Sequence, residues 1–115
     1  SIYFMAFSFT SDAIGEMMIK KYKQGLKVAG VFESRGAYSA YSEYVKMRTE
    51  GLPVRLDKNR HVMHHKVIII DNRITISGSY NFSKNANKRN EENILIINNK
   101  EIAGQYFSEL KRVYK

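Results

Sequence analysis

The chain has 115 residues, 43% of them hydrophobic and 26% charged, which predicts a single folded domain over residues 1–115 and excludes an intrinsically disordered polymer. Its formal net charge of +8 indicates a polyanionic partner, nucleic acid before an anionic membrane surface. The absence of cysteine excludes disulfides and thiolate metal sites.

The chain opens on an apolar run, residues 2–7, that is typical of a core strand. We therefore expect the natural protein to have a further N-terminal segment that this chain lacks. No apolar run approaches the ~20 residues of a transmembrane helix, so we expect no stable membrane insertion. No targeting segment is visible, and the sequence assigns no compartment.

In chain order, the apolar pattern predicts strands that alternate with helices. We expect strands at residues 2–7, 26–32, 54–56, 63–70, 73–77 and 93–97, and helices from 10–12 to 25, from about 37 to 50, and from 100 to 114. The first helix is capped by Thr10, Ser11 or Asp12 and ends at Gly25. Because this helix lies between two predicted strands, we expect those strands to pair in parallel through a right-handed βαβ connection.

Helical spacing then assigns the side chains that face the core. The first helix should bury Ile14, Met17, Met18 and Tyr22, the second Tyr41, Tyr44 and Val45, and the third Ile102, Tyr106, Leu110 and Val113. Strands 63–70 and 73–77 should form a hairpin across Asp71 and Asn72. The expected fold class is α/β, with a mixed, mostly parallel sheet flanked by helices on both faces.

The expected hairpin carries the residues that point to a chemistry. Alternate residues of a strand share a face, so His64 and Lys66 face one way and His65 faces the other. We therefore expect His64 to be the nucleophile and Lys66 to lie beside it. A nucleophile with a fixed positive charge and nearby hydrogen-bond donors, here Ser79 and Asn81, suits attack on a phosphodiester without a metal.

The second strand of the hairpin should bring those donors back to the histidine. Counted across a tight turn, Ser77 lies opposite residue 66 or 65, and Gly78 allows a close backbone approach. Ser79 and Asn81 then share a face and can stabilise an oxyanion. Asp71 lies at the far end of the first strand, which makes it a turn residue and not an acid of the chemistry.

The spacing His64-x-Lys66-x4-Asp71, followed by Gly78-Ser79-x-Asn81, resembles the HKD motif of the phospholipase D superfamily. The runs 7–10, 51–55 and 90–93 are also similar to its single-motif endonuclease branch, so the resemblance covers essentially the chain from residue 2 onward and favours a bacterial source. In that branch a glutamate bonds the far nitrogen of the nucleophilic histidine, and Glu92 matches its position.

The resemblance implies a two-step reaction. His64 attacks phosphorus to form a phosphohistidine, which water then hydrolyses, and a second histidine serves as the acid and then the base. Because the motif occurs once in this sequence, the resemblance implies a homodimer with one site across its two-fold axis. It implies no cofactor and no metal, since Lys66 of each copy supplies the positive charge.

The expected function is that of an endonuclease acting on DNA or RNA with little sequence preference. The residues that we expect to contact the substrate are Arg55, Lys58, Tyr80 and Lys84. Two alternatives stay open: a lipid phosphodiesterase of the phospholipase D type, and a nucleic-acid-binding or -cleaving domain of a larger restriction or helicase-linked protein. A metal site at His61, His64 and His65 is disfavoured, because a strand turns the last two apart.

Overall fold

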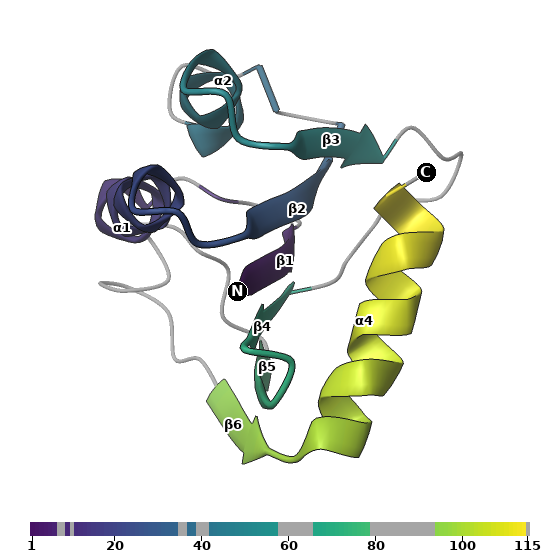
Figure 1. The fold of residues 1–115 in the computed structure, drawn as a ribbon. Helices are drawn as coiled ribbons and strands as arrows, with labels where there is room; N and C mark the ends of the chain where they lie inside the picture. The colour runs from purple at the N-terminus through teal and green to yellow at the C-terminus, as the bar shows by residue number, and fades with distance from the viewer. Residues whose placement is uncertain are drawn as a thin grey trace.

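The computed structural model describes residues 1–6, 9, 11–34, 37–38, 42–57, 66–78 and 94–114. Its elements in chain order are β1 (Ile2–Ala6), α1 (Asp12–Lys23), β2 (Val28–Glu33), α2 (Glu43–Thr49), β3 (Val54–Asp57), β4 (Lys66–Ile70), β5 (Ile74–Gly78), β6 (Ile94–Asn98) and α4 (Lys100–Tyr114). The strands form one sheet, with α1 and α2 on one face and α4 on the other (Figure 1). The predicted α/β class is confirmed.

The strands lie in the order β3-β2-β1-β4-β5-β6. β1 pairs in parallel with β2, and β2 with β3, while the β1–β4, β4–β5 and β5–β6 pairs are antiparallel. The predicted mixed sheet is confirmed, but parallel pairs are the minority among those described, two of five, where a mostly parallel sheet was expected. The reason lies in the connections, because a parallel pair needs a crossover whereas β4 and β5 are joined by a tight hairpin.

The face under α1 and α2 holds a cluster of aromatic rings. Phe4 packs edge-on against Phe9 and Phe32, with ring centroids 5.5 and 5.4 Å away. Tyr44 of α2 meets Phe32 in the same way at 5.3 Å. All four side chains are buried, and burying one such ring contributes roughly 1.5–3 kcal/mol. This cluster fixes α2 onto the strands β1 and β2.

The opposite face is covered by α4. Its buried residues Ala103, Leu110 and Val113 pack on Met5, Val31, Val67 and Ile69 of the central strands. The predicted inward stripe is confirmed by Leu110 and Val113, with Ile102 and Tyr106 partly buried. Within the described part of the chain, no helix is both long and apolar enough to cross a membrane.

The ends of α1 follow the predicted signals. Ser11 is the cap, since its hydroxyl accepts a hydrogen bond from the Ile14 N–H at 3.4 Å, whereas the alternative cap Thr10 lies outside the described residues. Gly25 follows the helix with φ 98°, a conformation that favours glycine. The expectation for Met17 is wrong, because its side chain is 51% exposed. It is rotated by about 100° from the buried Met18, away from the arc that faces the sheet.

The second helix is shorter than predicted. It begins after Ser42, whose hydroxyl accepts a hydrogen bond from the Tyr44 N–H at 3.3 Å, and so it starts six residues later than expected. Tyr44 is buried as predicted, but the expectation for Val45 is wrong because it is 45% exposed. The buried face instead includes Glu43 and Met47, and Tyr41 lies outside the described residues.

The β4–β5 hairpin turns through three residues. Asp71 and Asn72 have φ values of 55° and 52°, which these two residue types tolerate better than most, and the Arg73 N–H bonds the Ile70 carbonyl at 3.1 Å. Val67 is therefore opposite Ser77, so the expected pairing of Ser77 with residue 66 or 65 is wrong. The predicted register is shifted by one residue, because Arg73 belongs to the turn and not to β5.

Candidate active site

One edge of the sheet gathers an end of each of the six described strands, including β6, whose first residue Ile94 pairs with Gly78. The strands β1, β2 and β3 run to it and end at Ala6, Glu33 and Asp57, while β4 begins there at Lys66 and β5 ends there at Gly78. The pairings Ala6 with Lys66 and Glu33 with Asp57 hold these ends level. We call this the carboxyl edge. In sheets of this kind, ligands bind beyond the carboxyl ends of the parallel strands.

Lys66 is the predicted catalytic residue that the structure describes. It begins β4 next to Ala6 and is partly buried. Alternation along the strand places it on the same face as Ile68, which packs under α1 and α2. Because β4 lies between β1 and β5, its main chain is held on both sides, so the lysine extends from a fixed point. Such a fixed ammonium can stabilise charge that develops on a phosphoryl group.

The other predicted catalytic residues, His64, Ser79, Asn81 and Glu92, lie outside the described residues. So do the predicted substrate contacts Lys58, Tyr80 and Lys84. Gly78 is described and ends β5, and extending the Val67–Ser77 pairing by one step places it beside Lys66. The roles assigned to the residues that precede Lys66 and follow Gly78 therefore stay predictions.

Asp71 lies at the other end of β4 from the carboxyl edge. It occupies the hairpin turn, and its side chain is 71% exposed. Its backbone N–H donates to the carbonyl oxygen of Ser1 at 2.9 Å, which ties the turn to the start of β1. The structure thus places this member of the motif where a turn residue is needed, apart from Lys66.

Sequence reasoning missed two buried carboxylates at the carboxyl edge. Glu33 is 2% exposed and Asp57 is 6% exposed. Each is the last residue of a strand whose preceding residues are largely apolar, which is the pattern that could have revealed them. They neighbour Phe32 and Leu56 of the α1/α2 face, so alternation directs both to the α4 side, opposite Lys66. This position indicates that the two carboxylates stabilise the carboxyl edge and do not share a face with Lys66.

Arg55 is not brought together with Lys66. It lies on β3, which β2 and β1 separate from β4, and its guanidinium carbon is 4.7 Å from the centroid of the Tyr114 ring of α4. The hydroxyl of Tyr114 donates to the Pro53 carbonyl at 3.3 Å. These contacts join the end of α4 to β3, so Arg55 helps to hold the helix on the sheet.

The family model described as cardiolipin synthase, PLD-like domain, matches residues 1–114. The chain belongs to this phospholipase D-like family. The predicted superfamily is confirmed.

Individual relatives of this phospholipase D-like domain include proteins named phospholipase D and cardiolipin hydrolase. The chain is 34% identical to a phospholipase D of Rickettsia felis over 92% of its length and 53% of the relative's. It is 28% identical to a mitochondrial cardiolipin hydrolase of Chlamydomonas reinhardtii, over 94% and 48% of the two chains. It therefore spans about half the length of these curated relatives.

A solved structure supports the architecture. Nuc from Salmonella typhimurium, described as a phospholipase D family member, matches with a TM-score of 0.90 and 32% identity. The match covers 98% of this chain and 76% of that one. The architecture of this chain is thus that of a known fold.

Proposed function

We propose that this domain is a metal-independent phosphodiesterase that cleaves DNA or RNA as a non-specific endonuclease. The observation that supports it most is the position of Lys66. This lysine begins a central strand at the carboxyl edge of a fold that matches Nuc with a TM-score of 0.90. The net charge of +8 favours a polyanionic substrate over an isolated lipid head group.

In the proposed reaction, a nitrogen of the His64 imidazole forms a bond to phosphorus while the bond from phosphorus to the leaving oxygen breaks. A second His64, from a partner copy, gives its proton to that oxygen. The same partner histidine then takes a proton from water, which displaces His64 and regenerates it. The reaction consumes one water molecule and needs no oxidant or other co-reactant.

The remaining motif residues have supporting roles in this proposal. Lys66 supplies positive charge to the phosphoryl oxygens, and Ser79 and Asn81 donate hydrogen bonds to them. Glu92 orients the imidazole and stabilises its positive form. The contacts to the nucleic-acid backbone come from Lys58 and Lys84, while Tyr80 stacks on a base or sugar. Arg55 can join them only for a substrate long enough to reach β3.

We further propose that the active species is a homodimer, because one motif supplies only one of the two histidines that the reaction needs. Mixing His64→Ala protein with wild type should then reduce activity by more than dilution, as inactive mixed dimers form. Sedimentation at the assay concentration should give a dimer. Full activity from a sedimenting monomer would contradict this part of the proposal.

Lipid cleavage is the second candidate, and the names of the curated relatives favour it, phospholipase D and cardiolipin hydrolase. The deciding assay offers plasmid, single-stranded DNA, RNA and cardiolipin vesicles to the protein in EDTA. We expect cleavage of nucleic acid that His64→Ala abolishes and that His65→Ala, the matched control, retains. Turnover of vesicles alone would favour the lipid enzyme, binding without turnover would favour a binding domain, and dependence on Mg²⁺ would contradict the mechanism.

A further inference from the structure

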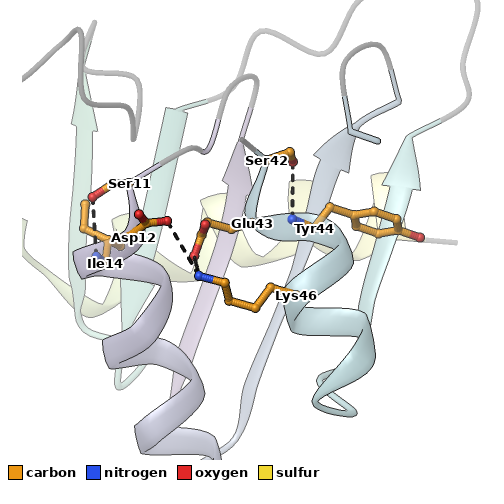
Figure 2. A network of polar contacts seen from close by, with 7 residues as sticks. All are labelled: Ser11, Asp12, Ile14, Ser42, Glu43, Tyr44 and Lys46. Atoms are coloured by element: carbon orange, nitrogen blue, oxygen red, sulfur yellow. Dashed lines mark hydrogen bonds and ion pairs between the residues drawn. The ribbon is translucent and has the colours of Figure 1, made fainter. Parts of the chain in front are cut away.

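A carboxylate that the proposed reaction does not use is buried between the two helices of one face. Glu43 is the first residue of α2 and is only 2% exposed. Its Oε1 atom is fully buried and makes no hydrogen bond among the described residues. Figure 2 shows the side chain pointing from α2 toward α1, with Lys46 and Asp12 beside it. A buried acid placed in this way needs a physical reason, since burying an unsatisfied carboxylate is costly.

The space for Glu43 exists because α1 has a glycine at the point of contact. A Cβ atom built on Gly15 would lie 2.0 Å from Glu43 Oε1 and 2.7 Å from its carboxyl carbon. Any larger residue at this position of α1 would therefore displace the carboxyl group. Glycine inside a helix costs about 0.5–1 kcal/mol relative to alanine, so this contact has its own energetic cost. The absence of a side chain at Gly15 thus leaves the space that the Glu43 carboxyl group occupies.

Among the residues that the structure describes, the charged groups that act on Glu43 come from both helices. On α2, Lys46 Nζ lies 3.5 Å from Glu43 Oε1, and it also lies 3.6 Å from Asp12 Oδ1 at the start of α1 (Figure 2). Glu16, one turn further along α1, adds a second negative charge near Lys46. The Lys46 side chain is 43% exposed, so solvent weakens its attraction for Glu43.

This setting changes the acidity of Glu43. Burial first, and then contact with the Asp12 carboxyl, raise its pKa to about 7, although Lys46 acts in the opposite direction. A glutamate that is ordinarily charged thus keeps its proton in the folded protein at mildly acidic pH. The contact with Gly15 is therefore made by a neutral carboxyl group below neutrality and by a charged one above it.

The contact between Glu43 and Gly15 is linked to the carboxyl edge, so a change in this contact can affect the proposed active site. The Glu43 N–H donates to the Phe9 carbonyl at 2.9 Å, and Phe9 comes shortly after the end of β1 at the carboxyl edge. The cap of α2, Ser42, directly precedes Glu43, and the carbonyl oxygen of the α1 cap, Ser11, accepts a hydrogen bond from the Gly15 N–H at 3.0 Å. By alternation, Lys66 extends from the sheet on this same face.

We propose that Glu43 and Gly15 form a proton-operated clamp between α1 and α2. With its proton, the Glu43 carboxyl packs over Gly15 and holds the starts of the two helices together at the carboxyl edge. When the proton is lost, the charge draws water and Lys46 toward the contact, and the joint between the helices loosens. Glu43 is thus a positioning residue and not a catalytic one.

The first test compares wild type with Glu43→Gln in denaturant unfolding at pH 5 and pH 8. An acid whose pKa is higher in the folded than in the unfolded state stabilises the fold below about pH 4.5, and this contribution is lost as the pH rises to about 7. The folding equilibrium constant of wild type should fall by about tenfold to a hundredfold more than that of Glu43→Gln between these pH values. Identical pH dependence of the two proteins would overturn the clamp.

A second measurement does not depend on any variant folding. A carboxyl ¹³C titration of the wild-type protein should show one glutamate that titrates near pH 7, and a titration of Glu43 near its ordinary pKa of 4.5 would overturn the proposal. Amide exchange in the first turns of α1 and α2, corrected for its intrinsic pH dependence, should increase above pH 7. Protection that is unchanged across this range would also count against the clamp.

A matched pair of variants tests the fit between the two residues. Gly15→Ala should lower the melting temperature in wild type, because the new methyl group displaces the Glu43 carboxyl. In a Glu43→Ala background the same change should be neutral or raise it, since alanine favours the helix. Equal effects in both backgrounds would contradict the pairing.

The consequence for catalysis rests on the proposed function. If cleavage is observed, the pH profile of wild type should contain a step near pH 7 that Glu43→Gln lacks. Failure to detect any phosphodiesterase activity would count against the proposed function alone, because unfolding, titration and amide exchange decide the clamp without a substrate. A profile that is the same in both active proteins would overturn the coupling of the clamp to the site.

Discussion

The two halves of the sheet differ in how completely they are covered. The parallel half, β1 to β3 with α1 and α2, contains Phe4, Val31 and Met47 at 0% exposure. In the antiparallel half, burial declines from β4 to the last described strand, β6, where Leu95 is 61% and Ile96 68% exposed. The fold is therefore anchored in the first half, and the strand that carries the motif lysine lies at the junction of the two.

The largest expected effect tests where stability resides. Phe4→Ala should destabilise the protein by about 3–5 kcal/mol, because it removes a ring that contacts Phe9 and Phe32 and leaves a cavity. The matched change in the antiparallel half, Ile96→Ala, should cost less than about 0.5 kcal/mol. Urea unfolding measures both. Similar losses for the two variants would remove the distinction between the halves.

The next effect concerns chemistry and not stability. Lys66→Met should lower the cleavage rate by about 10²–10³-fold, since it removes a fixed charge from the phosphoryl oxygens. Its unfolding free energy should stay within about 1 kcal/mol of wild type, because Lys66 lies at the start of β4 and not in its buried centre. The control is Lys100→Met on the exposed start of α4, which should leave the rate unchanged. Equal cleavage rates for Lys66→Met and wild type would contradict a role for Lys66 in the reaction.

A smaller effect concerns the helix that starts beside the clamp. Ser11→Ala should cost about 1 kcal/mol, because the Ile14 N–H loses the hydroxyl that it bonds at 3.4 Å. Ser108→Ala is the control, since that exposed hydroxyl bonds Gly104 within α4 and alanine favours the helix. Thermal unfolding should show a loss only for Ser11. A loss of the same size for Ser108 would indicate that the cap has no special role.

The smallest effect separates two roles of one arginine. Arg55→Ala should lower stability by about 0.5–1 kcal/mol through loss of its contact with the Tyr114 ring. Cleavage of a short oligonucleotide should be unchanged, because β2 and β1 separate Arg55 from the strand of Lys66. A large rise in KM for the short substrate would instead place this arginine at the site.

The sequence allowed most elements of the fold to be predicted, because their signals are local. The stripe of α4 and the cap of α1 were readable, since helical spacing and a serine before an apolar run need no knowledge of the tertiary structure. The wrong predictions concern features that depend on tertiary packing or on the exact length of a turn. Met17 and Val45 are apolar yet exposed, because the sheet contacts only one arc of each helix. The register of the hairpin depended on a third turn residue, Arg73.

The candidate site was predicted by its motif, and the structure adds the setting of Lys66 at the carboxyl edge. The buried carboxylates Glu33 and Asp57 were missed although they end apolar strands, and the burial of Glu43 could not be predicted from the sequence at all. Charged residues ordinarily indicate a solvated surface, and only the neighbours brought by folding, such as Gly15 for Glu43, show why a carboxylate can be buried. A pair formed by residues on two different helices has no local pattern in the sequence.

The central claim, that His64 forms a covalent bond to phosphorus, can be tested by trapping the intermediate. The protein would be incubated in EDTA with an oligonucleotide that carries radioactive phosphorus at the cleaved bond, and then quenched in alkali and detergent, where phosphohistidine survives. We predict label on the peptide that contains both histidines, present in His65→Ala and absent in His64→Ala. Turnover without any label on the protein, or label that persists in His64→Ala, would contradict the account.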